Sequence, residues 1–340
     1  MKKKRCFCVL CGLGFLLLAG CRARTEEPFV DVPTEKPTGV PAVTGTTERL
    51  PEEKRISIAV GDNYAAYLDE EGGLHILYAP EEIMENLDLE KKYAALGKDS
   101  STLVTIDEEG KLWAYYPFTA EEVEDINRQT AEEAAKYGGN YGLSSPNPGI
   151  IRSFAELSGV RQVISNYPFE SAVLLEDGTL LHESYSKGTY SWEGVTLKEF
   201  ADAEGTAGIT EDGTFVFQST GWEREKKLKE WPEKLKQICA GNCIVGLTEE
   251  GTVIAEEAEL DYIINTVEKW SGISMVAARG GTVIGLKTDG TVVAVCTLGN
   301  DRGQCAVEEW RDIVAVDTNG RVTVGVRKDG SFVKTEERIR

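Results

Sequence analysis

Histidine is almost absent from this chain, with only 2 among its 340 residues. His75 and His182 are far apart in the sequence, and neither lies near a Gly-x-Ser-x-Gly motif. The chain also lacks a phosphate-binding P-loop. The linear signatures of common hydrolases and nucleotide-binding enzymes are therefore missing, and we predict no catalytic residue, cofactor or metal site.

Positive charge is scarce as well. The chain has 37 Lys and Arg residues against 57 Asp and Glu residues, which gives a formal net charge of −20. Such a field repels phosphate backbones and anionic lipid headgroups. We therefore expect no nucleic-acid partner, and we expect any ligand to be neutral or cationic.

The apolar run near the N-terminus is too short to cross a membrane. It covers 13 residues, 6–18, whereas a spanning helix needs about 20. Four basic residues precede it, so residues 1–20 match an export signal peptide. The segment ends in Leu18-Ala19-Gly20-Cys21, which resembles the lipobox of bacterial lipoproteins. This resemblance implies lipid attachment at Cys21; the alternative is an ordinary signal peptide with an incidental cysteine.

Attachment of two acyl chains would hold the protein stably at a bacterial cell membrane, on the extracytoplasmic side. The membrane would be contacted through this lipid anchor only. Residues 21–54 are rich in Pro, Thr and Glu and show no apolar periodicity. We interpret them as an extended tether between the anchor and the folded domain.

Seven segments share one layout of three apolar runs with an acidic, glycine-containing turn before the third. They cover residues 56–77, 94–115, 161–183, 197–218, 235–256, 273–295 and 313–335. The turn glycines are Gly72, Gly110, Gly178, Gly213, Gly251, Gly290 and Gly330, spaced by 38, 68, 35, 38, 39 and 40 residues. A repeat of about 40 residues with three strands is typical of a β-propeller.

The glycine has a local reason, because a tight hairpin between the second and third strands needs a residue with φ > 0. We therefore predict an all-β fold, a seven-bladed β-propeller over residues 55–340. Six blades would result if one degenerate N-terminal copy were not a blade. Ring closure would bring the last strand, at 331–335, near Ile56.

The clearest copy runs from Trp270 to Trp310 and includes Gly299, Asn300, Gly303 and Gln304. Its layout resembles the repeat of the regulator of chromosome condensation family, which implies the propeller fold. The guanine nucleotide exchange performed by eukaryotic members is not expected of an exported protein. Aromatic residues also recur at the repeat period, and either fill one packing pocket per blade or form a ligand-stacking ring; they are Phe154, Trp192, Trp231, Trp270 and Trp310.

The enlarged gap between the second and third repeats is an insertion at about residues 117–150. Thr119 and Glu122 match a capping box, which predicts a helix start there. An apolar stripe follows at helical spacing, and then a Gly- and Pro-rich loop at 137–149. The stripe either packs on the propeller or, like the loop, meets a partner; its residues are Val123, Ile126, Thr130, Ala134 and Tyr137.

Four cysteines remain after the leader and Cys21 are set aside. Cys239 with Cys243 and Cys296 with Cys305 are the natural disulfide pairs, the alternative being four buried thiols. A zinc site is disfavoured by the irregular spacing. The acidic turns at 69–71 and 107–109 lack the spacing of a calcium loop, so we interpret them as solvated turns.

These features favour a monomeric, membrane-anchored extracytoplasmic module for binding or scaffolding, with a protein or glycan at the cell surface as its partner. Its ligand-binding residues are not identified by sequence. The alternative is an exported enzyme that acts on polysaccharide or cell-wall material through one propeller face, since such sites leave little linear trace.

Lipid attachment at Cys21 can be tested directly. We expect the Cys21→Ser variant to lose both metabolic labelling with a radioactive fatty acid and retention in the membrane fraction, because the acylated thiol is the predicted anchor. Retention of the unlabelled variant with membranes would place the anchor elsewhere.

Overall fold

The computed structural model describes residues 56–336, except most of 120–156, the segments 167–169, 185–187, 202–206, 218–230 and 257–260, and positions 193, 298 and 300. Cys21 and the loop at 137–149 therefore lie outside the described residues, as does the predicted apolar stripe. Residues 53–340 form one compact unit. Within the described ranges, no helix is long and apolar enough to cross a bilayer.

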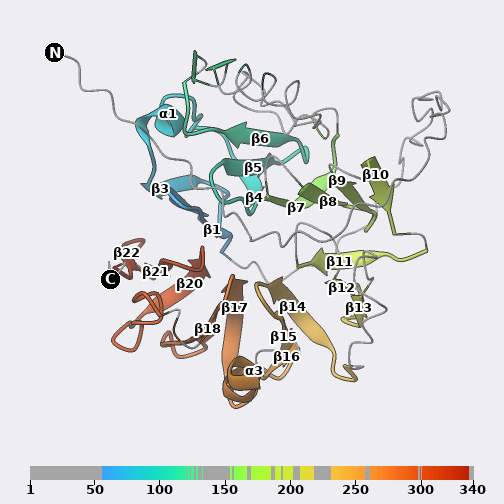
Figure 1. Ribbon diagram of the computed structural model, residues 1–340, viewed down its shortest axis with the longest axis vertical. Coiled ribbons are helices and arrows are strands. Elements are labelled where there is room, and N and C mark those ends of the chain that lie inside the picture. Colours follow the sequence, from blue (N-terminus) through green and yellow to red (C-terminus); the bar gives the residue numbers. More distant parts are fainter. Residues whose placement is uncertain are drawn as a thin grey trace, which may run out of the picture. The chain divides into compact units, whose positions relative to one another are not determined.

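The described chain is nearly all β, as predicted, and each of the seven repeats forms one antiparallel sheet (Figure 1). We number the sheets 1 to 7 in chain order. Sheet 1 contains β1 (Ile58–Val60), β2 (Ala65–Leu68) and β3 (Leu74–Tyr78); sheet 2 contains β4 (Tyr93–Leu96), β5 (Leu103–Asp107) and β6 (Leu112–Tyr115); sheet 3 contains β7 (Val160–Asn166), β8 (Glu170–Leu175), β9 (Leu180–Ser184) and a fourth strand, β10 (Gly188–Ser191).

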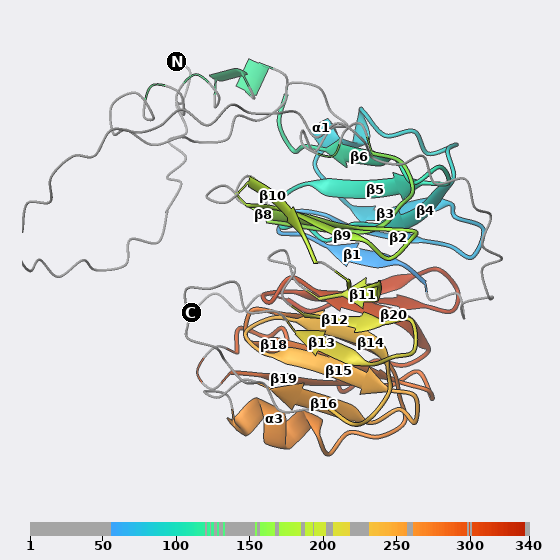
Figure 2. The ribbon, with the colours of Figure 1, turned by 90° about the vertical axis from the view of Figure 1, so that its right-hand side faces the viewer.

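The remaining four sheets again have three strands each. Sheet 4 contains β11 (Leu197–Phe200), β12 (Ala207–Thr210) and β13 (Phe215–Phe217); sheet 5 contains β14 (Leu235–Ala240), β15 (Ile244–Thr248) and β16 (Val253–Glu256); sheet 6 contains β17 (Ile273–Arg279), β18 (Thr282–Lys287) and β19 (Val292–Cys296); sheet 7 contains β20 (Ile313–Thr318), β21 (Thr323–Arg327) and β22 (Phe332–Lys334). Two short helices join sheets: α1 (Glu81–Met84) follows sheet 1, and α3 (Asp261–Val267) lies beside β16 (Figure 2).

The turn glycines do more than allow a positive φ. At Gly213, where φ is 79°, the carbonyl oxygen accepts a hydrogen bond of 2.9 Å from the Leu235 N–H at the start of the next sheet. A Cβ at Gly213 would lie 2.7 Å from the Leu235 carbonyl oxygen. The same bond joins each of the first six sheets to its successor. Glycine is therefore required both for the turn and for the close approach of the next sheet.

The five recurring aromatics pack against the apolar core, so the packing interpretation is confirmed. Trp231 and Trp310 are buried, and their rings cover a glycine in the middle strand of the same sheet. A Cβ at Gly246 would lie 2.7 Å from the Trp231 ring, and one at Gly325 would lie 2.9 Å from the Trp310 ring. Because glycine has no Cβ, the indole ring can pack directly against the backbone of the middle strand.

A second recurring link runs along the first strands. In six sheets the ladder shifts register just after the first residue of the first strand, which marks a β-bulge. In sheet 5 the residue after the bulge is Gln237, whose side chain donates to the Val276 carbonyl at 2.9 Å and accepts from the Val276 N–H at 3.0 Å. Gln162 binds Phe200 of sheet 4 in the same way.

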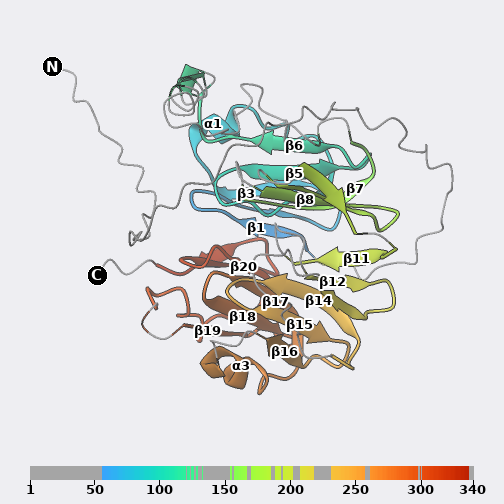
Figure 3. The ribbon, with the colours of Figure 1, turned by 45° about the vertical axis from the view of Figure 1, so that its right-hand side comes forward.

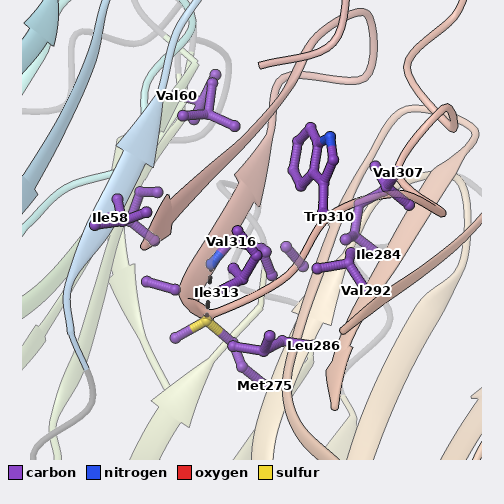
Figure 4. Packing of buried hydrophobic residues seen from close by; sticks show 14 of the residues in the cluster. Ile58, Val60, Met275, Ile284, Leu286, Val292, Val307, Trp310, Ile313 and Val316 are labelled. Atoms are coloured by element: carbon purple, nitrogen blue, oxygen red, sulfur yellow. Dashed lines mark hydrogen bonds between the residues drawn. The ribbon is translucent and has the colours of Figure 1, made fainter. Parts of the chain in front are cut away.

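Two further sheets use other acceptors at that position. Glu199 accepts from the Ile238 N–H at 3.2 Å, and the Met275 sulfur lies 3.5 Å from the Val316 N–H. Figure 4 shows the Met275 contact among the side chains packed between sheets 6 and 7. In sheets 3, 4, 5 and 6 the bulge thus aims one side chain at the backbone of the next sheet.

The last sheet closes onto the first by a variant of this link. The Asp317 carboxylate accepts from the Val60 N–H at 3.0 Å, and the Asn319 side chain donates to the Gly61 carbonyl at 2.8 Å. One apolar cluster includes residues of both sheets, and Ile56 and Val333 pack against it, as the predicted closure requires. β1 accordingly lies beside β20 (Figure 3).

Asp317 also binds a cation from sheet 2, because the Lys98 ammonium lies 3.3 Å from its second oxygen. Burial alone would lower the pKa of Lys98, but the adjacent Asp317 raises it above the ordinary value. Near this pair, Arg279 of sheet 6 donates to the Ser100 hydroxyl at 2.9 Å. Sheets 2, 6 and 7 therefore meet through charged side chains.

We expect Asp317→Ala to lower the free energy of unfolding by about 2 kcal/mol, because the Val60 N–H and Lys98 each lose a partner. Asp317→Asn keeps an acceptor for Val60 and should lose less. The measurement is chemical denaturation, with the exposed turn variant Glu250→Ala as the matched control. Equal stability of the Asp317→Ala and Glu250→Ala variants would mean that this closure contributes nothing.

Candidate functional site

The residues singled out by sequence fall in separate places. His75 lies in β3 of sheet 1 and His182 in β9 of sheet 3, so the two imidazoles form no common site. Cys239 and Cys243 belong to sheet 5, whereas Cys296 ends β19 of sheet 6. Cys21 and the loop at 137–149 lie beyond the described ranges.

The start of the insertion is a capping box, as predicted. The Glu122 N–H donates to the Thr119 hydroxyl oxygen at 3.2 Å, and the Thr119 N–H donates to the Glu122 carboxylate at 2.9 Å. The described positions that follow, among them Glu121 and Asp125, are helical. The insertion therefore leaves sheet 2 as a helix directly after Phe118.

The acidic turn of sheet 2 gathers a cation and an indole. The Asp107 carboxylate accepts from the Lys91 ammonium at 2.8 Å and from the Trp113 indole N–H at 2.9 Å. The same ammonium lies 3.9 Å from the centroid of the Trp113 ring, in a cation–π contact. The backbone N–H groups of Glu109 and Lys111 also donate to Asp107.

These bonds keep Asp107 charged. Burial alone would raise the pKa of its carboxyl, but hydrogen bonds from Lys91, Trp113 and the Lys111 backbone lower it to about 2. The carboxylate is therefore ionised at every physiological pH and remains a charged acceptor for Lys91 and Trp113.

Sheet 1 carries the same construction with different groups. The His75 Nε2 lies 2.7 Å from the Asp69 carboxylate, and the backbone N–H groups of Glu71 and Gly73 donate to the other oxygen. The His75 ring stacks on Tyr67 with centroids 4.6 Å apart. Asp69 and Asp107 thus serve as turn acceptors, which agrees with the interpretation of both segments as turns.

Exposed large apolar side chains are concentrated in the stretch of chain that contains Trp113. Six large apolar side chains are exposed in the described part of the chain, and four of them come from residues 84–118. We call these four, together with Lys91, the outer patch: Met84, Leu89, Lys91, Trp113 and Phe118. Leu89 is 52% exposed and Phe118 is 43% exposed.

The outer patch rests on a buried base. Ile83 of α1 and Tyr115 of β6 belong to one apolar cluster, which holds α1 beside β6 as Figures 2 and 3 show. The Tyr93 hydroxyl donates to the Asp88 carbonyl at 3.1 Å and so fixes the segment that carries Leu89. The exposed apolar groups therefore sit on a folded support.

Acidic side chains border the outer patch along the chain. Glu81, Glu85 and Glu90 are exposed between sheets 1 and 2, and further exposed acids, Glu121, Glu122 and Glu124, open the insertion helix. An apolar centre with a charged rim is the usual composition of a protein–protein contact surface.

Sequence reasoning missed the outer patch. Trp113 stands one residue after the start of its strand, where sheet 5 has Ile254 and sheet 6 has Val293, both partly buried. The tryptophan at this half-exposed strand position was the one feature of the sequence that could have indicated an exposed apolar surface. It carried no information about Met84 and Leu89, whose exposure depends on how α1 packs.

Comparisons with known proteins give the fold. No family model matches the chain, and no curated protein is similar to it. The ectodomain of the receptor kinase CR4 from Physcomitrella patens is 9% identical, with a TM-score of 0.54, over 84% of this chain and 74% of that one. The CRINKLY WD40 ectodomain of the receptor kinase ACR4 from Arabidopsis thaliana is 11% identical, with a TM-score of 0.51, over 82% of this chain and 93% of that one.

The structure of Kap60 bound to yeast RCC1 (Prp20) matches at a TM-score of 0.46 and 14% identity, over 72% of this chain and 69% of that one. The two ectodomains are similar in fold alone. Together with the sheet-to-sheet links that run from sheet 1 through sheet 7 and back to sheet 1, they identify the described domain as a β-propeller.

Proposed function

We propose that this protein is a lipid-anchored module on the extracytoplasmic side of a bacterial cell membrane, and that it binds a protein partner through the outer patch. The anchor is Cys21, supported by the leader that ends in Leu18-Ala19-Gly20-Cys21. The tether at 21–54 spaces the domain from the lipid. The domain has seven blades, one for each sheet, built from repeats of the regulator of chromosome condensation type.

The observation that carries the binding role is the clustering of exposed apolar side chains in residues 84–118. A propeller commits its strands to packing between blades, so its individual surface lies at edges and loops. Here Trp113 and Phe118 are exposed on a supported base, immediately before the only long insertion between repeats. Such apolar surface gains free energy when a partner covers it.

The charges suggest the kind of partner. The acids around the outer patch repel anions, and the formal net charge of −20 acts in the same direction at long range. A protein surface with an apolar centre and basic residues at its border complements both features. A neutral surface glycan is the other ligand that the charge permits, stacked on Trp113, and the experiment below separates the two.

We expect a photo-cross-linking amino acid at position 89 or 118, introduced into the chain in living cells, to give the same discrete adduct with one protein. The matched control is position 262, because Tyr262 is 52% exposed but lies on α3, far along the chain from the outer patch. The readout is an immunoblot, followed by mass spectrometry of the adduct.

Affinity then tests the patch itself. The double variant Leu89→Ser/Phe118→Ser should bind the purified partner at least tenfold more weakly, while Tyr262→Ser should bind as the unmodified protein does, because both sets of side chains are exposed and leave the fold intact. Identical adducts at positions 89, 118 and 262 would contradict the patch. A polydisperse adduct would indicate a glycan, and release of soluble sugar from cell-wall material would favour the enzyme alternative.

A further inference from the structure

Two of the four cysteines of the domain face each other. Cys296 is the last residue of β19, and its thiol forms a hydrogen bond with the thiol of Cys305. Both side chains are only partly buried. The two residues are nine positions apart, so the segment between them makes a short loop.

Thr282 at the start of β18 fixes both ends of this loop. Cys296 is its partner in the strand ladder, and the Gln304 side-chain amide, one residue before Cys305, donates to the Thr282 hydroxyl at 3.3 Å. The thiol contact therefore follows from the sheet register and from the position of Gln304.

Gln304 is itself held between two sheets. It is fully buried, and its carbonyl accepts from the Thr323 hydroxyl of sheet 7 at 2.7 Å. Its side-chain oxygen accepts from the Arg302 N–H at 2.6 Å. These bonds hold the backbone beside Cys305, so the fold fixes where its thiol meets that of Cys296.

The other cysteine pair has a different environment. Cys239 and Cys243 are 4% and 2% exposed, and they belong to the apolar cluster between sheets 5 and 6. Burial raises the pKa of the Cys239 thiol. Access to an oxidant is disfavoured there, whereas Cys296 and Cys305 are partly exposed, so the two pairs that the sequence treats alike differ in accessibility.

We propose that Cys296 and Cys305 form a disulfide bond by exchange with a disulfide-containing oxidant, and that Cys239 and Cys243 remain thiols. Occurrence of this bond in the cell rests on the proposed export, because disulfides persist in oxidising compartments. The bond closes the loop whose end places Gln304 between sheets 6 and 7.

The exchange balances in two steps. The Cys296 thiolate attacks one sulfur of the oxidant, which forms a mixed disulfide and releases one thiol. The Cys305 thiolate then attacks the Cys296 sulfur, forms the intramolecular bond and releases the second thiol, so the two protein protons end on the reduced oxidant. Burial raises the pKa of both thiols, so the exchange is faster at alkaline pH, and the same bond results if Cys305 attacks first.

The sequence allows a direct readout. Trypsin cleaves after Lys287, Arg302 and Arg311, so the two cysteines fall on separate peptides, 288–302 and 303–311. Cys239 and Cys243 share the peptide 237–269. The full-length protein is incubated with oxidised glutathione, alkylated after denaturation, digested and analysed by mass spectrometry. We expect peptides 288–302 and 303–311 joined, and peptide 237–269 carrying two alkyl groups.

Stability gives a second measurement. Reduction should lower the melting temperature of the oxidised protein by about 5 °C, because the bond restricts a loop of about ten residues in the unfolded chain. The double variant Cys296→Ser/Cys305→Ser should show no dependence on reductant, and Cys305→Ser alone should give no linked peptides.

The outcomes are separable. Unlinked, alkylated peptides 288–302 and 303–311 after glutathione treatment would overturn the proposed disulfide, as would a bond within 237–269 in its place. Linked peptides in vitro, combined with alkylated thiols in protein taken directly from cells, would uphold the pair and contradict the export on which the proposed function depends.

Discussion

The hydrogen bonds that pass from one sheet to the backbone of the next are the interactions on which the rest of this domain depends. The turn glycines of the first six sheets provide one set, and the bulged first strands of sheets 3 to 6 provide the other. No strand is shared between sheets, so backbone ladders alone give seven separate small sheets. Gln162 and Gln237 each satisfy both a donor and an acceptor of the following sheet. Each such bond contributes only about 1 kcal/mol, but it fixes the register between neighbours and so allows the apolar surfaces between them to pack.

The exposure of the outer patch is a consequence of where the links between sheets lie. Because first strands and turn glycines hold the sheets together, the third strands are left as edges. In sheet 2 that edge carries Trp113, which Lys91 and Asp107 hold in place without covering it. The connection through α1 buries Ile83 and leaves Met84 and Leu89 outside. Because the first strands hold the sheets together, the side chains on the outer edge of sheet 2 are free to differ from those of other sheets. The insertion also begins at this edge.

Much of the architecture was predictable because it repeats. The period of the turn glycines gave the all-β propeller, and the spacing of Thr119 and Glu122 gave the start of a helix. The role of Gly213 as an acceptor for the next sheet was not predictable, because that bond joins residues whose proximity depends on the finished ring. The role of Gln237 was not predictable either. The β-bulge before it breaks the alternation of buried and exposed side chains, so strand periodicity alone predicts that Gln237 faces solvent. The exposure of Leu89 depends on tertiary packing, and the contrast between the two cysteine pairs depends on burial, which spacing does not record.

The links along the first strands have a direction, since in each case the side chain of an earlier sheet reaches the backbone of a later one. A gene duplication that copied one such repeat would copy both the side chain that makes the link and the backbone groups that receive it. The new sheet could then bind both of its neighbours through the same hydrogen bonds. Two junctions differ: sheet 2 meets sheet 3 through the backbone of Lys98, and sheet 7 meets sheet 1 through Asp317 and Val60. Gain or loss of a repeat is therefore easiest to accommodate among sheets 3 to 6, whereas the first and last copies must stay matched to each other.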